Sequence, residues 1–400
     1  MDDTDPPPGS GTLTVPDHVL IVGACAAGLA TLEALRLRGY TGKVTLLGDE
    51  IHPPYDRPPL SKQILSGSWQ PQRASLRTAE ALLALDADLR LGEPAVSLDV
   101  ATRTVQAADG STYRGDAVVI ATGAHPRRLP GSDGVAGVHV LRGLDDTLRL
   151  REDLEPGRKL VVVGDGVLGC EIAATAVQLG VHTTLAGPQR DPMQMQLGAD
   201  IAARLRDLHH AHGVHLRLGT GVTALEAAGS RATGVRLATG EVLPADVVVV
   251  AFGAAPATSW LTGSGLQTDN GLVCDSRCRA ADGIYAVGDV ARFQHERLGR
   301  SVRLENRTNA IEQAIVVAAN ILGEDQPYAP IPYFWTDQYT VKIQVYGIPT
   351  PDMRISVVDG DPATGRFVAA YHLDGRPAAV LGWNMPKQAR QQRQRLLVTP

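Results

Sequence analysis

Two stretches decide the fold of this chain: VLIVGACAAG at residues 19–28 and LVVVGDGVLG at residues 160–169. Each is an apolar run typical of a buried strand, followed at once by a Gly-x-x-x-x-Gly turn and a helix-forming segment. Backbone N–H groups and the helix dipole at such a helix start attract a pyrophosphate. One such stretch is weak evidence, but two of them predict two dinucleotides on one chain. The simplest protein of this kind takes a hydride from a nicotinamide and keeps it on FAD.

The composition sets limits on the class of protein. Four hundred residues exceed one typical core, so two or three domains are expected. The net charge of −5 gives no reason to expect nucleic-acid binding. The acidic, Pro- and Gly-rich residues 1–16 predict a disordered tail without signal-peptide features. No uncharged apolar run reaches ~18 residues, so we expect a cytoplasmic protein without a membrane span.

The first stretch opens a β–α–β unit. A helix is expected over 26–38, and a strand over 43–47 leads to Asp49 and Glu50. Asp49 follows Gly28 at about the 20-residue spacing of an acid that binds a ribose hydroxyl.

A proline-rich segment, HPPYDRPPLSK, follows at 52–62. Its prolines hold the backbone extended, so neither helix nor strand is expected there. A short helix at about 78–85 comes next. Residues 86–124 predict antiparallel strands around an Asp-Gly turn at 109–110.

The second stretch opens a repeat of the same order. Its elements are expected as strand, helix, strand and helix at 160–163, 167–179, 181–186 and 198–212. The later run ADVVVVAFGAAPAT (245–258) also repeats DAVVIATGAHP (116–126). The repeat therefore extends beyond the glycine turns.

The last third predicts a return to the first unit and then a further domain. DGIYAVGDVA (282–291) is expected to be a strand that ends in a Gly-Asp turn. A helix over 306–322 has apolar residues at 311, 315, 318 and 322 on one face. From about residue 327 the pattern predicts an antiparallel sheet, closed by a helix at 386–397.

These motifs carry a family resemblance. The chain resembles the FAD-dependent, NAD(P)H-oxidising ferredoxin and rubredoxin reductases, the group of putidaredoxin reductase-like proteins and dioxygenase reductase components. The resemblance covers about residues 17–390, and DRPPLSK and FWTDQ are its most specific elements. The motifs are GDEIHPPYDRPPLSK (48–62), VVIATGAHPR (118–127), VVVGDGVLGCEIA (161–173), YAVGDVARF (285–293), RLENRTNAIEQA (303–314) and YFWTDQ (333–338).

The resemblance implies an α/β, glutathione-reductase-like two-dinucleotide-binding fold with a C-terminal α+β domain. It implies an FAD-binding domain at 17–123 plus 249–326, an NAD(P)H-binding domain at 124–248 and a C-terminal domain at 327–400.

The resemblance also implies roles for residues at the cofactors. Ala26, Ala27 and Gly28 are expected against the FAD pyrophosphate, Asp49 at the adenosine ribose and Asp289 at the ribityl chain. Arg57, Lys62 and Arg127 are cations beside an anionic cofactor. The other positions expected at FAD or at NADH or NADPH are Gly23, Cys25, Glu50, Val96, Ala121, Thr122, Gly123, Gly164, Gly166, Val167, Leu168, Gly169, Gly187, Arg190, Gly253, Gly288 and Arg307.

Lys62, Glu171 and Trp335 are the residues expected to act in the reaction. By resemblance, Trp335 lies beside the flavin, and Glu171 faces the nicotinamide and pairs with Lys62. A buried Lys–Glu pair orients the nicotinamide and stabilises a reduced, anionic flavin. Each residue also has a structural interpretation: Lys62 as a solvated lysine, Glu171 as a helix-terminal charge and Trp335 as a core aromatic.

The sequence departs from the family at Cys25, where a glycine usually lets the backbone approach the pyrophosphate. A cysteine side chain is small enough for FAD to bind with a slight shift. The alternative is a reactive thiol beside the flavin.

A second departure lies at the end of the 181–186 strand. Gly187 stands where the family has an acid, and Pro188, Gln189 and Arg190 follow. A basic residue accommodates a 2′-phosphate and an acid repels it. Arg190 therefore allows NADPH, Asp191 could substitute for the acid, and the choice of coenzyme stays open.

Cysteines and histidines give no metal site. Cys274 and Cys278 are spaced C-x-x-x-C without a nearby histidine, so two reduced thiols are expected. His209, His210 and His212 are interpreted as helix-face residues.

The implied partner is a small acidic iron–sulfur ferredoxin that serves an oxygenase such as a haem-thiolate monooxygenase, and the chain itself is expected as a monomer or weak homodimer. An acidic partner requires a basic face on the reductase. The alternative is that the basic runs of this sequence are only solvated surface. Two clusters are candidates: Arg292, Arg297, Arg300, Arg303 and Arg307, and Lys387, Arg390, Arg393 and Arg395.

The same fold also supports other functions. Disulfide or peroxide reduction needs a cysteine facing the flavin, and residues 51–66 contain none. An NAD(P)H oxidase or an FAD-binding redox sensor stays open as the alternative.

Overall fold

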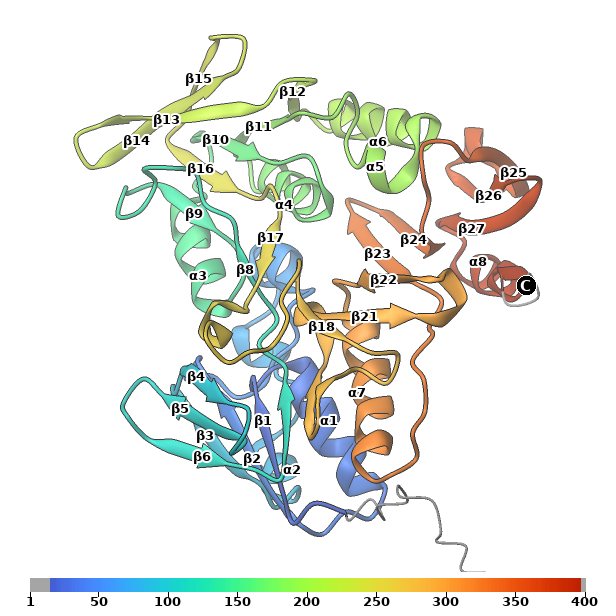
Figure 1. Cartoon of the computed structure of the whole chain (residues 1–400). Coiled ribbons are helices and arrows are strands. Elements are labelled where there is room, and N and C mark those ends of the chain that lie inside the picture. The colour runs from blue at the N-terminus through green and yellow to red at the C-terminus, as the bar shows by residue number, and fades with distance from the viewer. Residues whose placement is uncertain (1–14, 397–400) are drawn as a thin grey trace, which may run out of the picture.

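The computed structural model describes residues 15–396 of the chain. The expected disordered tail therefore lies almost wholly outside the described residues. Figure 1 shows two α/β units, the first around β1 and the second around β10, with a separate antiparallel sheet beside them. Within residues 15–396, no helix is long and apolar enough to cross a membrane.

The first unit is built on a six-stranded sheet with the order β19-β20-β7-β1-β2-β3. Its strands are β1 (His18–Val22), β2 (Lys43–Gly48), β3 (Asp88–Leu91), β7 (Ala117–Ile120), β19 (Arg279–Ala281) and β20 (Ile284–Ala286). Two helices, α1 (Ala26–Leu37) and α7 (Arg307–Ile321), pack against each other on it. Residues 19–22 are buried, as expected of a parallel strand covered on both faces.

The second unit repeats this plan with a five-stranded parallel sheet ordered β12-β11-β10-β16-β9. Its strands are β9 (Val138–Val140), β10 (Lys159–Val163), β11 (His182–Gly187), β12 (His215–Leu218) and β16 (Val247–Val250). Its helices are α3 (Leu144–Asp153), α4 (Val167–Gln178), α5 (Gln194–Leu197) and α6 (Ala199–Ala211). Strand β16 runs across the expected boundary at 248–249, and the division into domains stays a prediction.

Short strands join and flank the two units, and all of them pair in antiparallel fashion except β18, which pairs with β21 in parallel. Strands β8 (Ala124–Pro126) and β17 (Ala254–Pro256) pair as the chain passes between them. The flanking strands are β4 (Ala95–Asp99), β5 (Thr104–Ala107), β6 (Thr112–Arg114), β13 (Val222–Ala228), β14 (Arg231–Leu237), β15 (Val242–Pro244), β18 (Leu272–Cys274), β21 (Ala291–His295) and β22 (Arg300–Arg303).

The C-terminal sheet has the order β23-β24-β27-β26-β25 and is entirely antiparallel, as predicted. Its strands are β23 (Tyr333–Gln338), β24 (Val341–Gly347), β25 (Arg354–Asp361), β26 (Arg366–Leu373) and β27 (Arg376–Trp383). Helix α8 (Pro386–Arg393) and the 3₁₀ turn Gln394–Leu396 close the described chain. The remaining short helices are α2 (Ala79–Leu83), the π-helical turn Leu60–Ile64 and 3₁₀ turns at Pro71–Ala74, Ser259–Leu261, Gly288–Val290, Glu296–Leu298 and Pro362–Thr364.

Two sequence predictions of local structure were wrong. Strands β3 and β7 pair with their neighbours in parallel rather than antiparallel, because both belong to the first sheet. The proline-rich segment is irregular only up to Pro59, and a helical turn begins at Leu60. A proline is tolerated at a helix start, where its missing N–H has no partner to lose.

The predicted apolar face of α7 was also wrong. Ile315 is 43% exposed, whereas Asn309 and Gln313 are 3% and 0% exposed. The Gln313 Oε1 accepts a hydrogen bond of 2.8 Å from the Gly288 backbone N–H. Apolar periodicity misplaced the face because these buried polar side chains have hydrogen-bond partners.

Candidate functional site

A cavity of about 640 Å³ lies where the two units and the C-terminal sheet meet. Both glycine turns face it, and so do the proline-rich segment and β23. Its predicted lining residues are Cys25, Ala26, Ala27, Arg57, Lys62, Ala121, Gly123, Gly164, Gly166, Val167, Leu168, Glu171, Gly253, Gly288, Asp289, Arg307 and Trp335. The fold thus brings residues from across the chain to one site.

The two glycine turns have the same internal geometry. Gly23 and Gly164 both have φ +123°, a value that favours glycine. A Cβ on Gly28 would lie 2.0 Å from the Gly23 carbonyl oxygen, and one on Gly169 would lie 1.8 Å from that of Gly164. These glycines let each helix start pack closely on its strand, which leaves the helix N-terminus open toward the cavity.

Cys25 lies at the N-cap of α1 and lines the cavity. Its thiol donates to the carbonyl oxygen of Ala121 at 3.2 Å, so the sulfur is held against the residue that follows β7. Cys170, Cys274 and Cys278 are buried free thiols, as predicted for the C-x-x-x-C pair. The residues that the structure describes contain no group of His, Cys, Asp or Glu that could hold a metal.

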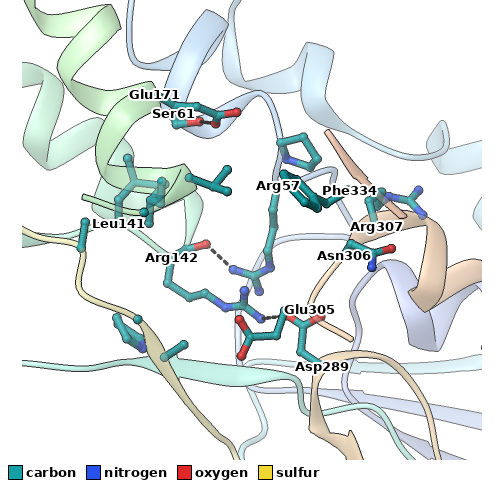
Figure 2. Close-up of a pocket in the computed structure, with 18 of the residues that line it drawn as sticks. Arg57, Ser61, Leu141, Arg142, Glu171, Asp289, Glu305, Asn306, Arg307 and Phe334 are labelled. Atoms are coloured by element: carbon teal, nitrogen blue, oxygen red, sulfur yellow. Dashed lines mark hydrogen bonds and ion pairs between the residues drawn. The ribbon is translucent and has the colours of Figure 1, made fainter. Parts of the chain in front are cut away.

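Arginines and acids line one end of the cavity, at the bottom of Figure 2. Arg57 donates to the Arg142 carbonyl oxygen and to Glu50 Oε1, the latter at 2.6 Å. Arg142 in turn lies 3.3 Å from the carboxylate of Asp289. These contacts fix two guanidinium groups beside the first glycine turn.

Arg307 carries a buried donor that lacks a partner. Its Nε donates to Asp56 at 2.5 Å, but its Nη1 is buried and has no hydrogen-bond partner within residues 15–396. Buried donors are almost always paired in native proteins. An unpaired guanidinium N–H in a cavity that also contains a helix N-terminus therefore fits an anionic group such as the pyrophosphate of FAD.

The other end of the cavity holds a buried ion pair. Lys62 Nζ lies 2.6 Å from Glu171 Oε2, and the two side chains are 14% and 7% exposed. Ser61 donates to the same oxygen at 2.5 Å (Figure 2). Thr336, on β23 next to Trp335, donates to Glu171 Oε1 at 2.8 Å. The carboxylate thus joins the proline-rich segment, α4 and the C-terminal sheet.

A hydrogen-bond chain continues from this carboxylate into the protein. Gln338 Nε2 lies 3.1 Å from Thr336 Oγ1, and His209 Nε2 lies 2.9 Å from Gln338 Oε1. Burial lowers the pKa of His209 to about 4, so the imidazole is neutral. A neutral imidazole that donates to Gln338 accepts at Nδ1, where Tyr339 Oη lies at 2.9 Å. Every donor in the chain therefore points toward Glu171, and His209 is buried rather than on a solvated helix face.

Several predicted residues do not line the cavity. Asp49, Arg127 and Arg190 are exposed, and Val96 is 46% exposed on β4. Glu50 is bonded to Arg57 and to the Tyr55 hydroxyl. Thr122 donates to the Ala257 carbonyl oxygen. Four predicted glycines instead allow close packing within the two turns and at the end of β11: Gly23, Gly28, Gly169 and Gly187. The ligand-binding roles of all these residues stay predictions.

The cavity also contains residues that the sequence reasoning missed: Arg142, Asp165, Gln189, Gln196, Glu305, Asn306 and Phe334. Asp165 had a visible signal, because it stands between two glycines of the second turn, and Glu305, Asn306 and Phe334 lie within motifs that carry the family resemblance. Arg142 had none, since it follows a short strand without a motif.

Two glycine turns that face one cavity define an oxidoreductase of the two-dinucleotide class. The chain belongs to the pyridine nucleotide-disulphide oxidoreductase family, whose model matches residues 17–314, and residues 333–398 match the reductase C-terminal model. Within that family it belongs with the ferredoxin reductases of oxygenase systems.

Three relatives show this. Rhodocoxin reductase of Rhodococcus erythropolis is 35% identical over 92% of this chain and 87% of its own length. The benzene 1,2-dioxygenase ferredoxin–NAD(+) reductase subunit of Pseudomonas putida is 37% identical over 93% of this chain and 90% of its own. The reductase in a covalent putidaredoxin reductase–putidaredoxin complex is similar with a TM-score of 0.90 and 34% identity, over 95% of this chain and 93% of that one.

Proposed function

We propose that this protein moves electrons from NAD(P)H through FAD to a small acidic iron–sulfur ferredoxin, which serves an oxygenase such as a haem-thiolate monooxygenase. The observation that carries the proposal is the single cavity that both glycine turns face, with the buried Lys62–Glu171 pair in its wall. Such a cavity would let the two dinucleotide-binding turns hold FAD and the nicotinamide coenzyme in one site. Bound FAD supplies the chemistry that converts a two-electron donor into single-electron steps.

The residues divide this work between them. The α1 N-terminus and Arg307 hold the FAD pyrophosphate by backbone N–H groups and a charged donor. Asp289 accepts hydrogen bonds from cofactor hydroxyls. Lys62 places a positive charge where negative charge develops, and Glu171 fixes that ammonium in place. Trp335 and Phe334 cover the cavity from β23 and exclude water.

The choice of partner rests on charge. In the first basic cluster Arg292, Arg303 and Arg307 are each bonded to an acid, so it is not a free cationic face. Arg297 instead donates to the Leu396 carbonyl oxygen at 2.8 Å. This contact joins the β21–β22 hairpin to the 3₁₀ turn that follows α8, and Figure 1 shows the hairpin beside the C-terminal end of the chain.

We define the docking face as Arg297, Arg300, Lys387 and Arg390. All four are exposed, and α8 contains no acid to neutralise its charges. A face of this kind raises the rate of encounter with an acidic ferredoxin and fixes its orientation.

Anaerobic stopped-flow mixing tests the first half-reaction. Bleaching of bound flavin by NADH or NADPH is expected, and no bleaching with either coenzyme would favour the redox-sensor alternative. Rapid flavin reoxidation by air without any acceptor would favour the oxidase.

Charge reversal tests the second half-reaction. The variant Lys387→Glu/Arg390→Glu should reduce ferredoxin about tenfold more slowly at low salt and approach the wild-type rate at high salt. Flavin reduction by the coenzyme should not change. Arg149→Glu, on α3 of the second unit, is the matched control, and an equal loss in that variant would refute docking at this face.

A further inference from the structure

A carboxylate occupies the place of the side chain that Gly187 lacks. Gly187 is the buried last residue of β11. A Cβ built on it would lie 2.3 Å from both Cγ and Oδ2 of Asp165. Asp165 belongs to the second glycine turn, so its side chain reaches from the end of β10 to the end of β11.

Neighbouring groups hold this carboxylate firmly. The backbone N–H of Gln189 donates to Oδ2 at 2.8 Å, and Gln189 Nε2 donates to Oδ1 at 2.7 Å. The Met193 backbone N–H donates to the Asp165 carbonyl oxygen at 2.8 Å. Asp165 is only 4% exposed. Each carboxylate oxygen still has a lone pair for one further donor.

The surroundings point to a ligand with hydroxyl or amino donors. Asp165, Gln189 and Gln196 all line the cavity, next to the N-terminus of α4. The Oε1 of Gln196 is buried and lacks a hydrogen-bond partner within the described part of the chain. A fixed carboxylate and an unpaired buried acceptor in the lining of one cavity suit a ribose or an adenine amino group.

We propose that Asp165 is the coenzyme-selecting acid of this protein: it accepts a hydrogen bond from the adenosine 2′-hydroxyl and excludes a 2′-phosphate, so NADH is the electron donor. This inference rests on the proposed function. In nucleotide-binding units an acid at the end of the second strand performs this task. Here the carboxylate reaches the same place from the neighbouring strand, and a phosphate there would bring two anions together in a buried site.

The two other candidates in the sequence are placed elsewhere. Asp191 is buried against Arg206, with 2.8 Å between Oδ1 and Nη1. Arg190 is exposed and is not among the residues that line the cavity. Neither residue competes with Asp165 for the ribose.

Four variants test the proposal. Asp165→Asn keeps the shape and removes the charge. Gly187→Glu places a second acid against Asp165, and Asp165→Gly/Gly187→Glu moves the acid to the usual strand position. Asp191→Asn is the matched control, since it neutralises a carboxylate that is equally buried but lies in the neighbouring loop between β11 and α5.

The ratio of kcat/KM for NADH to that for NADPH is the kinetic measurement. We expect the wild type to favour NADH by about 100-fold or more, and Asp165→Asn to lower the ratio about 10- to 100-fold, because a hydrogen bond to a charged group is lost. The double variant should recover most of the ratio, whereas Gly187→Glu alone should bind both coenzymes poorly. Asp191→Asn should keep the wild-type ratio.

Equilibrium binding gives a readout that needs no turnover. Calorimetry of the holoprotein with 5′-AMP and with adenosine 2′,5′-bisphosphate should show the same preference and the same order of variants. If neither coenzyme bleaches the flavin but these preferences hold, the proposed function fails and the role of Asp165 stands. A wild type that accepts both coenzymes equally, or a ratio that Asp165→Asn leaves unchanged, would overturn the inference.

Discussion

Replacing Lys62 by methionine removes one charge from the buried pair and keeps most of the side-chain volume. Glu171 would retain only two neutral donors, Ser61 at 2.5 Å and Thr336 at 2.8 Å. Breaking a buried ion pair at one partner costs about 3–5 kcal/mol, because the other charge stays buried and uncompensated. Since Lys62 is 14% exposed, some water reaches the pair, and we expect the lower end, about 3 kcal/mol of unfolding free energy.

Glu171→Gln should destabilise the protein by a similar amount, because it leaves the ammonium without its counter-charge. The double variant Lys62→Met/Glu171→Gln contains neither charge. It should therefore lie within about 1–2 kcal/mol of the wild type rather than at the sum of the two single losses.

Urea unfolding of the FAD-saturated variants measures this cycle. Far-ultraviolet circular dichroism reports the fold, and the rise in flavin fluorescence reports release of the cofactor. A loss below about 1 kcal/mol in Lys62→Met, or a double variant as unstable as the two single effects combined, would show that water screens the pair and would refute the reasoning.

Three further predictions concern the turn and the buried chain. Cys25 should be alkylated first by iodoacetamide in apoprotein and be protected by FAD, as mass spectrometry would show, because it is the one half-buried cysteine of the four. Gly28→Ala should abolish FAD retention on gel filtration, since its Cβ would meet the Gly23 carbonyl oxygen at 2.0 Å. Burial lowers the pKa of His209 from 6.5 to about 4, so between these values the unfolded chain binds a proton that the folded one does not. The free energy of unfolding should therefore decrease as the pH is lowered from 6.5 to about 4, by up to about 3 kcal/mol. The urea midpoints at pH 7 and pH 5 should differ less in His209→Gln than in the wild type. His210→Gln changes an exposed histidine and should show the same difference between the two midpoints as the wild type.

The elements of both units could be predicted because their signals are local. A short apolar run indicates a buried parallel strand. Each glycine turn indicates that a helix begins directly after it. The predicted helices over 26–38 and 167–179 differ from α1 and α4 by one residue at the C-terminal end. Strand direction was less certain, because β3 has the same local pattern whether it pairs in parallel or not.

The site was predictable only in part. The resemblance named Lys62 and Glu171, and the structure places them 2.6 Å apart although 109 positions separate them in the chain. Nothing local indicated that Arg307 is bonded to Asp56 or that His209 is buried in a chain leading to Glu171.

The amino-acid sequence by itself determined the two strand–turn–helix units, their repeat and the antiparallel C-terminal sheet. Apolar periodicity and glycine positions act within a few residues, so they can be read along the chain. The tertiary structure alone decided that the space left by Gly187 is filled by Asp165, a residue 22 positions earlier. That contact depends on how two parallel strands lie side by side, and the pattern of neither strand contains this information.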